Sequence, residues 1–539
     1  MTARLYRAGE IVTLEPGRPS AEALATVGAR ILAVGSERDC RAALASAGHA
    51  ACEEVDLAGG ALLPGFIDTH LHPIPIVIFE LNPDLGAARS IAEVVEILRA
   101  AEAGCEPGQW VLGLQLDDEA LAERRLPTRH ELDRVSATRP VVVLERDGHC
   151  SIGNSAALAA AGIGRDTPDP AGGRIDREPD GSPAGPCREA AGQLLLGGVP
   201  MPPLERVREA GRRAFRRIVA HGITSVGAVI QSDAEGPAGA AGAVELAAMQ
   251  LLLEEMPFCT YAIVVGRSAE AAEAARATSL HAPEAGRRTG GFKIFADGTF
   301  GSRTACMHQP FADAPDEAGF LVHDEDVLYA RMRDGHERGL QVCVHAIGDR
   351  AIARTLDLFE KLLAEHPRED VRHRIEHASL VAPDQARRLA SLGIAVSTQP
   401  LFIHSEKGWL HQRLGTARAR HAYPLRDLLD AGVRVGGASD APVESTCVLH
   451  SIQCCVTREG FEPGQAIEPL EALRLFTSGA AWLQFEEHEK GSLAPGKRAD
   501  LVALSHSPLR VPPERIAGIE VQRTVVGGVD VYRKKGEPA

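Results

Sequence analysis

The chain lacks the long apolar runs of a membrane protein. Its 539 residues contain no stretch of about eighteen consecutive apolar side chains, the length that a membrane-spanning helix requires. The residues after Met1 read TARLYRAGEIVTLEPG, without the apolar core of a secretory signal. These absences argue against a membrane protein, and we expect a soluble protein of the cytoplasm.

An excess of positive charge is also missing. The chain carries 58 Lys and Arg residues against 73 Asp and Glu residues, a formal net charge of −15, and no run of Lys and Arg forms a basic stripe. Nucleic acids and acidic membrane surfaces attract such a stripe and repel a negative protein. The composition therefore argues against both kinds of partner and leaves a small molecule as the expected ligand.

Nor do the cysteines form a disulfide framework. There are eleven of them, an odd number, and only Cys454 and Cys455 are neighbours. A small secreted protein held together by disulfides has paired cysteines at short spacings. We expect reduced and mostly buried thiols.

Short β-like segments are present at both ends of the chain. Runs such as EIVTLEPG near the start and ADLVALS near the end are rich in β-forming residues and are bounded by turn residues. Because chain termini commonly lie close together, these segments are expected to pair into one small β-sandwich domain. The expected domains are this β-sandwich, from residues 1–62 and 489–539, and a larger domain from residues 63–488 with an insertion at about 75–215.

The middle of the chain alternates short apolar runs with helical stretches. In RAIARTLDLFEKLLAEH, apolar residues recur at spacings of three and four, which is typical of a helix with one packed face. This alternation predicts an α/β fold with a parallel sheet, and eight such strands predict a (β/α)8 TIM barrel. The expected strands lie in GFIDTH, GITSV, CTYAIVVG, GFKIFAD, LQVCVH, HRIEH, IAVSTQ and GVRVGG. The expected large insertion follows the first of them.

Side chains that bind metals stand at the ends of several of these strands. His70 and His72 are one residue apart in PGFIDTHLHP, and His345, His377 and Asp440 each close a later strand segment. His345 and His377 are 32 residues apart, about one βαβ repeat of roughly thirty residues, and Asp440 follows 63 residues later. The carboxyl ends of barrel strands hold the active site. Two histidines on a loop with nothing to bind remain the simpler interpretation of His70 and His72 alone, but the five residues together predict a metal centre.

Lys293 in GFKIFAD is a sixth candidate ligand. If its side chain points into the barrel, apolar surroundings lower the pKa of the amine and favour its neutral form. A neutral amine adds carbon dioxide to give a carbamate, whose two oxygens suit a bridge between two divalent ions. The alternative is an ion pair between Lys293 and an acid such as Asp297.

These motifs resemble those of a known family. PGFIDTHLH, FKIFADGTFGSRTA, VHAIGDRAI, RIEHA, SDAPV and KGSLAPGKRADLV are similar to segments of the amidohydrolase superfamily, specifically its YtcJ-like branch, which includes N-substituted formamide deformylases. The resemblance covers nearly the whole chain. It implies a (β/α)8 barrel, a β-sandwich from both termini, a homodimer and a binuclear metal centre. By this resemblance one ion is held by His70, His72 and Asp440, a second by His345 and His377, and carboxylated Lys293 bridges the two.

The expected function is hydrolysis of a carbon–nitrogen bond in a small-molecule amide or formamide. Imidazole and carboxylate ligands favour two Zn²⁺ ions, with manganese, iron or cobalt as substitutes. Such ions lower the pKa of a bridging water, so that hydroxide attacks the carbonyl while Asp440 acts as general base and returns the proton to the leaving nitrogen. Asp68 is a candidate acceptor for an imidazole N–H. Substrate contacts are expected from His149, Ser302, Arg303 and His404, although each could instead only hold a loop in place.

Three other functions have to be weighed against the same sequence motifs. A deaminase of a cyclic amidine would use one ion and would not need the bridging lysine, so Lys293 argues against it. An esterase or lactonase would use the same centre, because a hydroxide attacks esters and amides alike. A binding or regulatory protein that retains the barrel without catalysis would not need a complete set of metal ligands, so the complete set argues against it.

Overall fold

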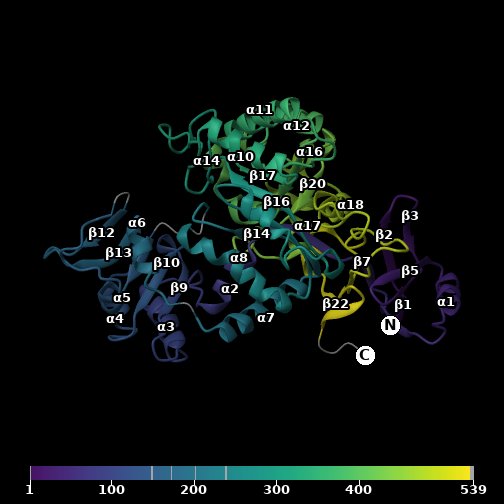
Figure 1. Cartoon of the computed structure of the whole chain (residues 1–539), viewed down its shortest axis with the longest axis horizontal. Helices are drawn as coiled ribbons and strands as arrows, with labels where there is room; N and C mark the ends of the chain where they lie inside the picture. Colours follow the sequence, from purple (N-terminus) through teal and green to yellow (C-terminus); the bar gives the residue numbers. More distant parts are fainter. Residues whose placement is uncertain (1, 147–149, 171–172, 201, 237–238, 535–539) are drawn as a thin grey trace. The chain divides into compact units, whose positions relative to one another are not determined.

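The computed structural model describes residues 2–146, 150–170, 173–200, 202–236 and 239–534. The chain divides into two compact units, one formed by Met1–Ile74 and Phe215–Ala539 and the other by Pro75–Ala214. Figure 1 shows both units, coloured along the sequence.

Eight parallel strands form the central sheet of the first unit, in the order β20-β19-β18-β17-β16-β15-β14-β8. In seven of them every residue is buried, as expected for strands of a parallel sheet that is covered on both faces. The strands are β8 (Phe66–Leu71), β14 (Ile223–Gln231), β15 (Cys259–Val265), β16 (Arg287–Phe295), β17 (Gln341–Ala346), β18 (Arg374–His377), β19 (Ala395–Thr398) and β20 (Val435–Gly437). Each expected barrel strand is therefore found, and the (β/α)8 barrel is confirmed.

The first and last strands meet and close the barrel. The Thr69 hydroxyl on β8 donates to the carbonyl of Gly437 on β20 at 3.1 Å. Just beyond the strand ends, the amide of Asp440 donates to the carbonyl of His70, and the amide of His72 donates to the carbonyl of Ala441, both at 2.8 Å.

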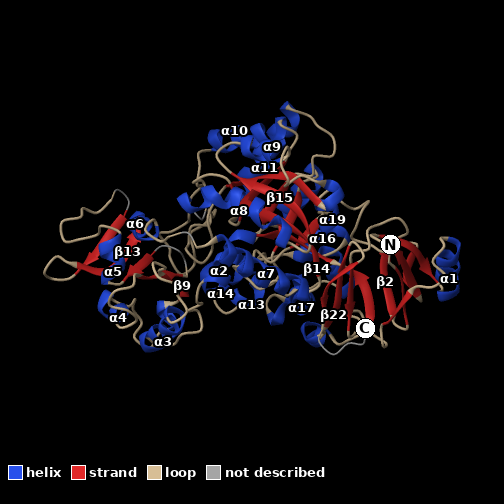
Figure 2. Cartoon of the chain, turned by 60° about the horizontal axis from the view of Figure 1, so that its bottom comes forward, coloured by secondary structure: helices blue, strands red, loops and turns tan. Residues whose placement is uncertain are grey.

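Helices between the strands cover the outside of this sheet (Figure 2). In α11 (Asp349–Glu365) the buried residues include Ile352, Leu356 and Phe359, one apolar stripe of a 3.6-residue period. The other helices after the second barrel strand are α8 (Glu245–Leu252), α9 (Glu270–Ala275), α10 (Glu325–Glu337), α12 (Pro383–Leu392), α13 (Phe402–Glu406), α14 (Leu410–Leu414), α15 (Thr416–Ala419), α16 (Leu425–Asp430), α17 (Val448–Thr457), α18 (Pro469–Leu475) and α19 (Ser478–Leu483).

The two chain ends build a β domain in the same unit. Its sheets have the orders β5-β4-β1-β6 and β23-β22-β21-β7-β2-β3, and in the second sheet β21 of the C-terminal segment pairs antiparallel with β7 of the N-terminal segment. Tyr6 and Leu24 of one sheet share a core with Leu62 and Leu501 of the other. The strands are β1 (Ala3–Arg7), β2 (Glu10–Glu15), β3 (Arg18–Ala21), β4 (Ala23–Val27), β5 (Arg30–Gly35), β6 (Glu53–Asp56), β7 (Ala61–Pro64), β21 (Leu501–Leu504), β22 (Val521–Val526) and β23 (Val529–Arg533).

The second unit is a five-stranded sheet of order β12-β13-β11-β10-β9 with helices of its own. Val94 and Leu98 of α3 share its core with Val141 and Ile152 of the sheet. Its main elements are α3 (Ile91–Glu102), β9 (Val111–Leu116), α4 (Arg129–Asp133), β10 (Val141–Glu145), β11 (Cys150–Gly153), α5 (Ser155–Ala160), β12 (Gly173–Arg177), β13 (Pro183–Glu189) and α6 (Ala190–Leu196).

Among the described residues, no helix combines the length and the apolar character needed to cross a membrane. All eleven cysteines are free thiols.

Candidate metal centre

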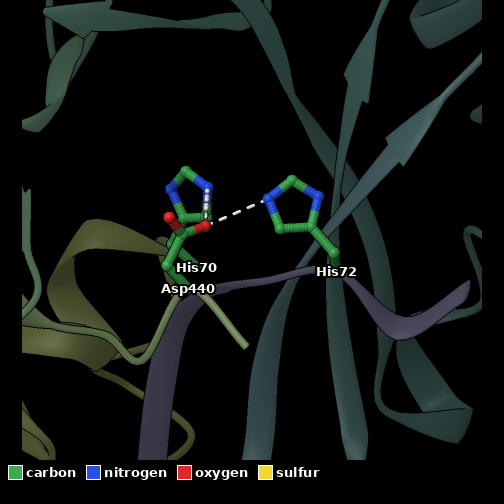
Figure 3. Close-up of side chains that lie close together, drawn as sticks. All are labelled: His70, His72 and Asp440. Atoms are coloured by element: carbon green, nitrogen blue, oxygen red, sulfur yellow. Dashed lines mark hydrogen bonds and ion pairs between the residues drawn. The ribbon is translucent and has the colours of Figure 1, made fainter. Parts of the chain in front are cut away.

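His70, His72 and Asp440 converge where the barrel closes. Oδ1 of Asp440 lies 3.3 Å from Nε2 of His70 and 3.1 Å from Nε2 of His72, and Figure 3 shows both contacts. Asp440 adopts a φ of 59°, an uncommon conformation for a residue with a side chain. Burial alone would raise the pKa of Asp440, but the imidazoles of His70 and His72 outweigh burial and hold the pKa well below its usual range. The carboxylate is therefore an anion facing two ring nitrogens.

The orientation of His70 is set by a buried acid that the sequence did not reveal. Nδ1 of His70 donates to Oε2 of Glu376 at 2.6 Å, and Oε1 of Glu376 accepts from Nε of Arg374 at 2.6 Å. All three side chains are fully buried. Burial would raise the pKa of Glu376, but Arg374 and His70 hold it well below the usual range. With its proton on Nδ1, His70 presents the lone pair of Nε2 to the centre.

The expectation for Asp68 is wrong. Its carboxylate accepts the backbone N–H groups of His70 at 3.1 Å and of Ser439 at 3.1 Å, and not an imidazole N–H. The reason is local: on an extended strand a carboxylate two residues upstream reaches the backbone amide more easily than the ring. Asp68 thus ties β8 to the segment after β20.

His345 and His377 form the opposite corner of the centre. Their ring centroids are 4.5 Å apart, and that of His377 is 5.2 Å from the His70 ring. Nδ1 of His377 is 2.8 Å from Oε1 of Gln399, and Nε2 of His345 is 3.1 Å from the carbonyl of Gly298. Burial lowers the pKa of His377 to about 3 and that of His345 well below its usual value. Both rings are therefore neutral, with one nitrogen each left as an acceptor.

The backbone of His377 explains how two neighbouring residues reach one centre. Strand alternation would send Glu376 and His377 to opposite faces of the sheet. The φ of His377 is 70°, so the extended conformation ends there and the ring turns inward. Both side chains consequently contact His70.

Lys293 points into the barrel and contacts the same ring. Its Nζ is 2.9 Å from Nε2 of His70, and the residue is 1% exposed. Burial lowers the pKa of its amine. Asp297 instead accepts three backbone N–H groups, from Cys306, Ile347 and Gly348, at 2.8 to 3.0 Å. The alternative, an ion pair between Lys293 and Asp297, is therefore not found among the contacts of the described residues.

The residues expected to contact substrate have other partners or are not described. His149 lies outside the described residues. The Ser302 hydroxyl bonds to Thr299 and Thr304, and Arg303 forms an ion pair with Asp313 at 3.1 Å. His404 bonds to Glu459. A role of any of these side chains in substrate binding stays a prediction.

The sequence as a whole matches a known family. The profile described as "Amidohydrolase family" matches residues 53–532. The chain belongs to the amidohydrolase family. Like this family, it is a metal-dependent hydrolase that acts on carbon–nitrogen bonds of small molecules.

Individual relatives of this amidohydrolase agree with the family assignment. The YtcJ protein of Bacillus subtilis (strain 168) is 33% identical over 494 residues, which cover 89% of this chain and 91% of that protein. The N-substituted formamide deformylase of Arthrobacter pascens is 31% identical over 549 residues and 97% of each chain. A solved structure described as an uncharacterized metal-dependent hydrolase from Pyrococcus horikoshii OT3 superposes with a TM-score of 0.77 at 26% identity, over 95% of this chain and 99% of that one.

Proposed function

We propose that this amidohydrolase cleaves the carbon–nitrogen bond of a small-molecule amide or formamide at a centre of two divalent ions, with Asp440 as the proton carrier. One observation carries the proposal: Nε2 of His70 faces both Oδ1 of Asp440, at 3.3 Å, and Nζ of Lys293, at 2.9 Å.

The arrangement around Asp440 fits a cation. Because His70 donates its Nδ1 proton to Glu376, its Nε2 is an acceptor, and it faces an ionised carboxylate. Two acceptors at 3.3 Å with no proton between them are stabilised by a positive ion. Tetrahedral Zn²⁺ with bonds of about 2.0–2.1 Å separates its ligand atoms by about 3.3 Å, close to the distances of Asp440 Oδ1 from His70 and His72.

The remaining residues supply donors for a second ion. His345 and His377 are neutral and adjacent, and each has one nitrogen bonded elsewhere, to Gly298 and Gln399, which leaves the other for a metal. Lys293 stands beside His70 with its amine pKa lowered by burial. Addition of carbon dioxide to this amine forms one N–C bond and releases one proton. The product is a carbamate anion with two oxygen donors.

Two ions held by these residues would, when bound, lower the pKa of a coordinated water and polarise the substrate carbonyl. Asp440 takes up a proton from that water as it attacks and then delivers the proton to the leaving nitrogen. The left-handed backbone conformation of Asp440 helps to hold Oδ1 of its carboxylate 3.3 Å from Nε2 of His70 and 3.1 Å from Nε2 of His72. Glu376 and Gln399 hold the rings of His70 and His377 in one tautomer during this cycle.

The relative from Arthrobacter pascens suggests the substrate class. Because that protein is named for N-substituted formamides and aligns over 97% of each chain, we propose N-substituted formamides or other N-acyl amines as substrates. Esters and lactones are the comparison class, because a hydroxide at the same centre could attack them, and we expect them to be poorer substrates.

Three measurements test this proposal together. Metal analysis should give at least two ions per chain. ¹³C-NMR of protein equilibrated with ¹³C-bicarbonate should show a carbamate signal that the Lys293→Met variant lacks. A panel of formamides, acyl amines, lactones and aminopurines should give the highest kcat/KM with the first two classes. One ion, no carbamate and release of ammonia from an aminopurine would replace the proposal by the deaminase alternative.

A further inference from the structure

A second group of metal-ligand side chains lies at α13, α17 and the short 3-10 helix η5 (Arg458–Gly460). It consists of His404 on α13, His450 on α17 and Glu459 on η5. One ligand atom from each residue lies within 4.8 Å of the other two. None of these residues belongs to the centre described above.

The distances within this group are close to those of a zinc site. Nδ1 of His404 is 2.9 Å from Oε2 of Glu459, and Nε2 of His450 is 3.0 Å from Oε1. The two imidazole rings have centroids 4.7 Å apart at an interplanar angle of 69°. A tetrahedral ion would require the N and O ligand atoms to be about 3.3 Å apart, so a small outward movement of each ring suffices.

A thiol lies next to the same carboxylate. Cys454 follows His450 by four residues on α17, which places both on one face of the helix. Its Sγ is 3.5 Å from Oε1 of Glu459. Tetrahedral zinc with a bond of about 2.3 Å to sulfur separates an S ligand from an O ligand by about 3.6 Å. Cys454 is not among the side chains whose ligand atoms all lie within 4.8 Å of one another, so the proposed ligand set leaves it out.

Charge and access also suit a cation. Lys407 forms an ion pair with Glu459. Burial would raise the pKa of Glu459, but Lys407 and His450 hold it at about 2, so the carboxylate is ionised. The side chain of His404 is 51% exposed, which leaves the group open to ions from solvent.

We propose that His404, His450 and Glu459 bind a Zn²⁺ ion at a site separate from the hydrolytic centre, and that the ion displaces Lys407 from Glu459. Two imidazoles and a carboxylate are a ligand set that zinc takes in proteins.

The site would act on the wall of the hydrolytic centre. Phe402 stands two residues before His404 on α13, and its ring stacks on that of His377 with centroids 6.4 Å apart and an angle of 8°. An ion that joins α13 to α17 and η5 fixes the helix that carries Phe402. This consequence rests on the proposed function, whereas zinc binding itself does not.

The test compares zinc content among variants of the full chain. Wild type and His404→Gln are equilibrated at one buffered free zinc concentration, and the bound zinc is counted after removal of free ions. His404→Gln should hold one ion fewer per chain, because the loss of a ligand costs more than the about 10–100-fold lost with an outer partner. The matched control is His411→Gln on α14: His411 pairs with Glu462 at 2.8 Å and is similarly exposed, at 46%. Equal zinc content in wild type and His404→Gln would overturn the proposal.

A second variant tests the competition with Lys407. Breaking an exposed ion pair costs about 0.2–1 kcal/mol, and Lys407→Met avoids this cost, so the variant should bind zinc at this site about 1.4- to fivefold more tightly than wild type. Titration with Co²⁺ after the hydrolytic centre has been filled with zinc measures the affinity of this second site alone. A thiolate-to-cobalt absorption band would show that Cys454 is also a ligand. Unchanged or weaker binding in Lys407→Met would mean that Glu459 serves only the ion pair. If wild type hydrolyses no compound of the panel while the zinc difference between wild type and His404→Gln is present, the proposed hydrolytic function is wrong and this site stands.

Discussion

Nδ1 of His70 lies 2.6 Å from a carboxylate oxygen of Glu376, so a fully buried acid on β18 fixes a ring on β8. An acid in this position keeps the proton of the imidazole on one nitrogen and makes the other nitrogen a stronger donor to a metal. Removing the acid alone leaves Arg374 charged and unpaired in the barrel, which costs about 3–5 kcal/mol. A fair test therefore removes both partners.

The double variant Arg374→Met/Glu376→Gln is expected to fold and to bind metal about 10–100-fold more weakly than wild type. Competition with a chelator of known affinity measures this change. Glu486→Gln/Lys490→Met is the matched control, because Glu486 and Lys490 also form a buried ion pair, at 3.0 Å. Wild-type metal affinity in the double variant would show that Glu376 does not position the ligand.

Asp440→Asn is expected to lower kcat by about 10²–10⁴-fold, because the amide cannot carry the proton from water to the leaving nitrogen. The melting temperature of the metal-free variant should stay close to that of wild type, since Asn has the same shape. Steady-state kinetics with the best substrate of the panel gives the rate. Turnover at the wild-type rate would exclude Asp440 as the proton carrier.

The stability of the chain is expected to fall in mild acid because of a buried histidine pair. Nδ1 of His336 accepts from Nε2 of His373 at 2.8 Å, Nε2 of His336 donates to the carbonyl of His366 and Nδ1 of His373 accepts the amide of Val342. Each ring therefore carries one proton and has no acceptor for a second. Burial, together with His336, lowers the pKa of His373 well below its usual value.

The direction of this effect follows from linkage. Below pH of about 6.5 the unfolded chain binds a proton at His373 and the folded chain does not, so the free energy of unfolding falls as the pH falls. At pH 5.5 the loss from His373 is about 1.4 kcal/mol relative to neutral pH. Urea unfolding of metal-free wild type and His373→Asn at pH 7.5 and 5.5 measures it, because contributions of other groups cancel in the comparison. The same pH dependence in both proteins would contradict this prediction.

Gly348 is expected to tolerate no side chain. It starts α11, and a Cβ atom there would lie 2.1 Å from the backbone oxygen of Cys306, which cannot move away without breaking the bonds of Asp297 to this turn. Gly348→Ala should therefore lower the free energy of unfolding by about 1–3 kcal/mol. Gly464→Ala, where a Cβ has no neighbour within 4 Å, is the control and should leave stability nearly unchanged. Equal melting temperatures of the two variants would show that the turn can adjust.

The strand positions of the barrel could be predicted because strands that are buried on both faces are rich in apolar residues. His345, His377 and Asp440 could be singled out because they close strand segments at the spacing of β/α repeats, and His70 because it stands one residue from His72 at the end of another. The sequence alone could not show that they approach one another, since this depends on how the sheet closes.

The supporting residues were missed for a different reason. Glu376 lies within the strand segment RIEH, where an acid interrupts the apolar pattern and gives no sign of a function. Its partner His70 comes from a distant part of the chain. Gln399 likewise follows β19 as an ordinary polar residue. The signal available was the pair Arg374 and Glu376, which alternation places on the same face of a buried strand, where neither charge is tolerated alone.

The meeting of β8 with β20 has a consequence for biosynthesis. His72 and Asp440 touch across 368 residues of chain, and the backbone bonds of Asp440 to His70 and of His72 to Ala441 complete the same corner. A chain that is still being synthesised has no such corner until the last barrel strand has emerged and docked. An ion that binds there stabilises only the closed barrel. The free energy of unfolding then rises with the logarithm of the ratio of ion concentration to dissociation constant. If the proposed centre binds metal, we expect the supply of metal to the cell to influence how much newly made chain stays folded, as well as how much of it is active.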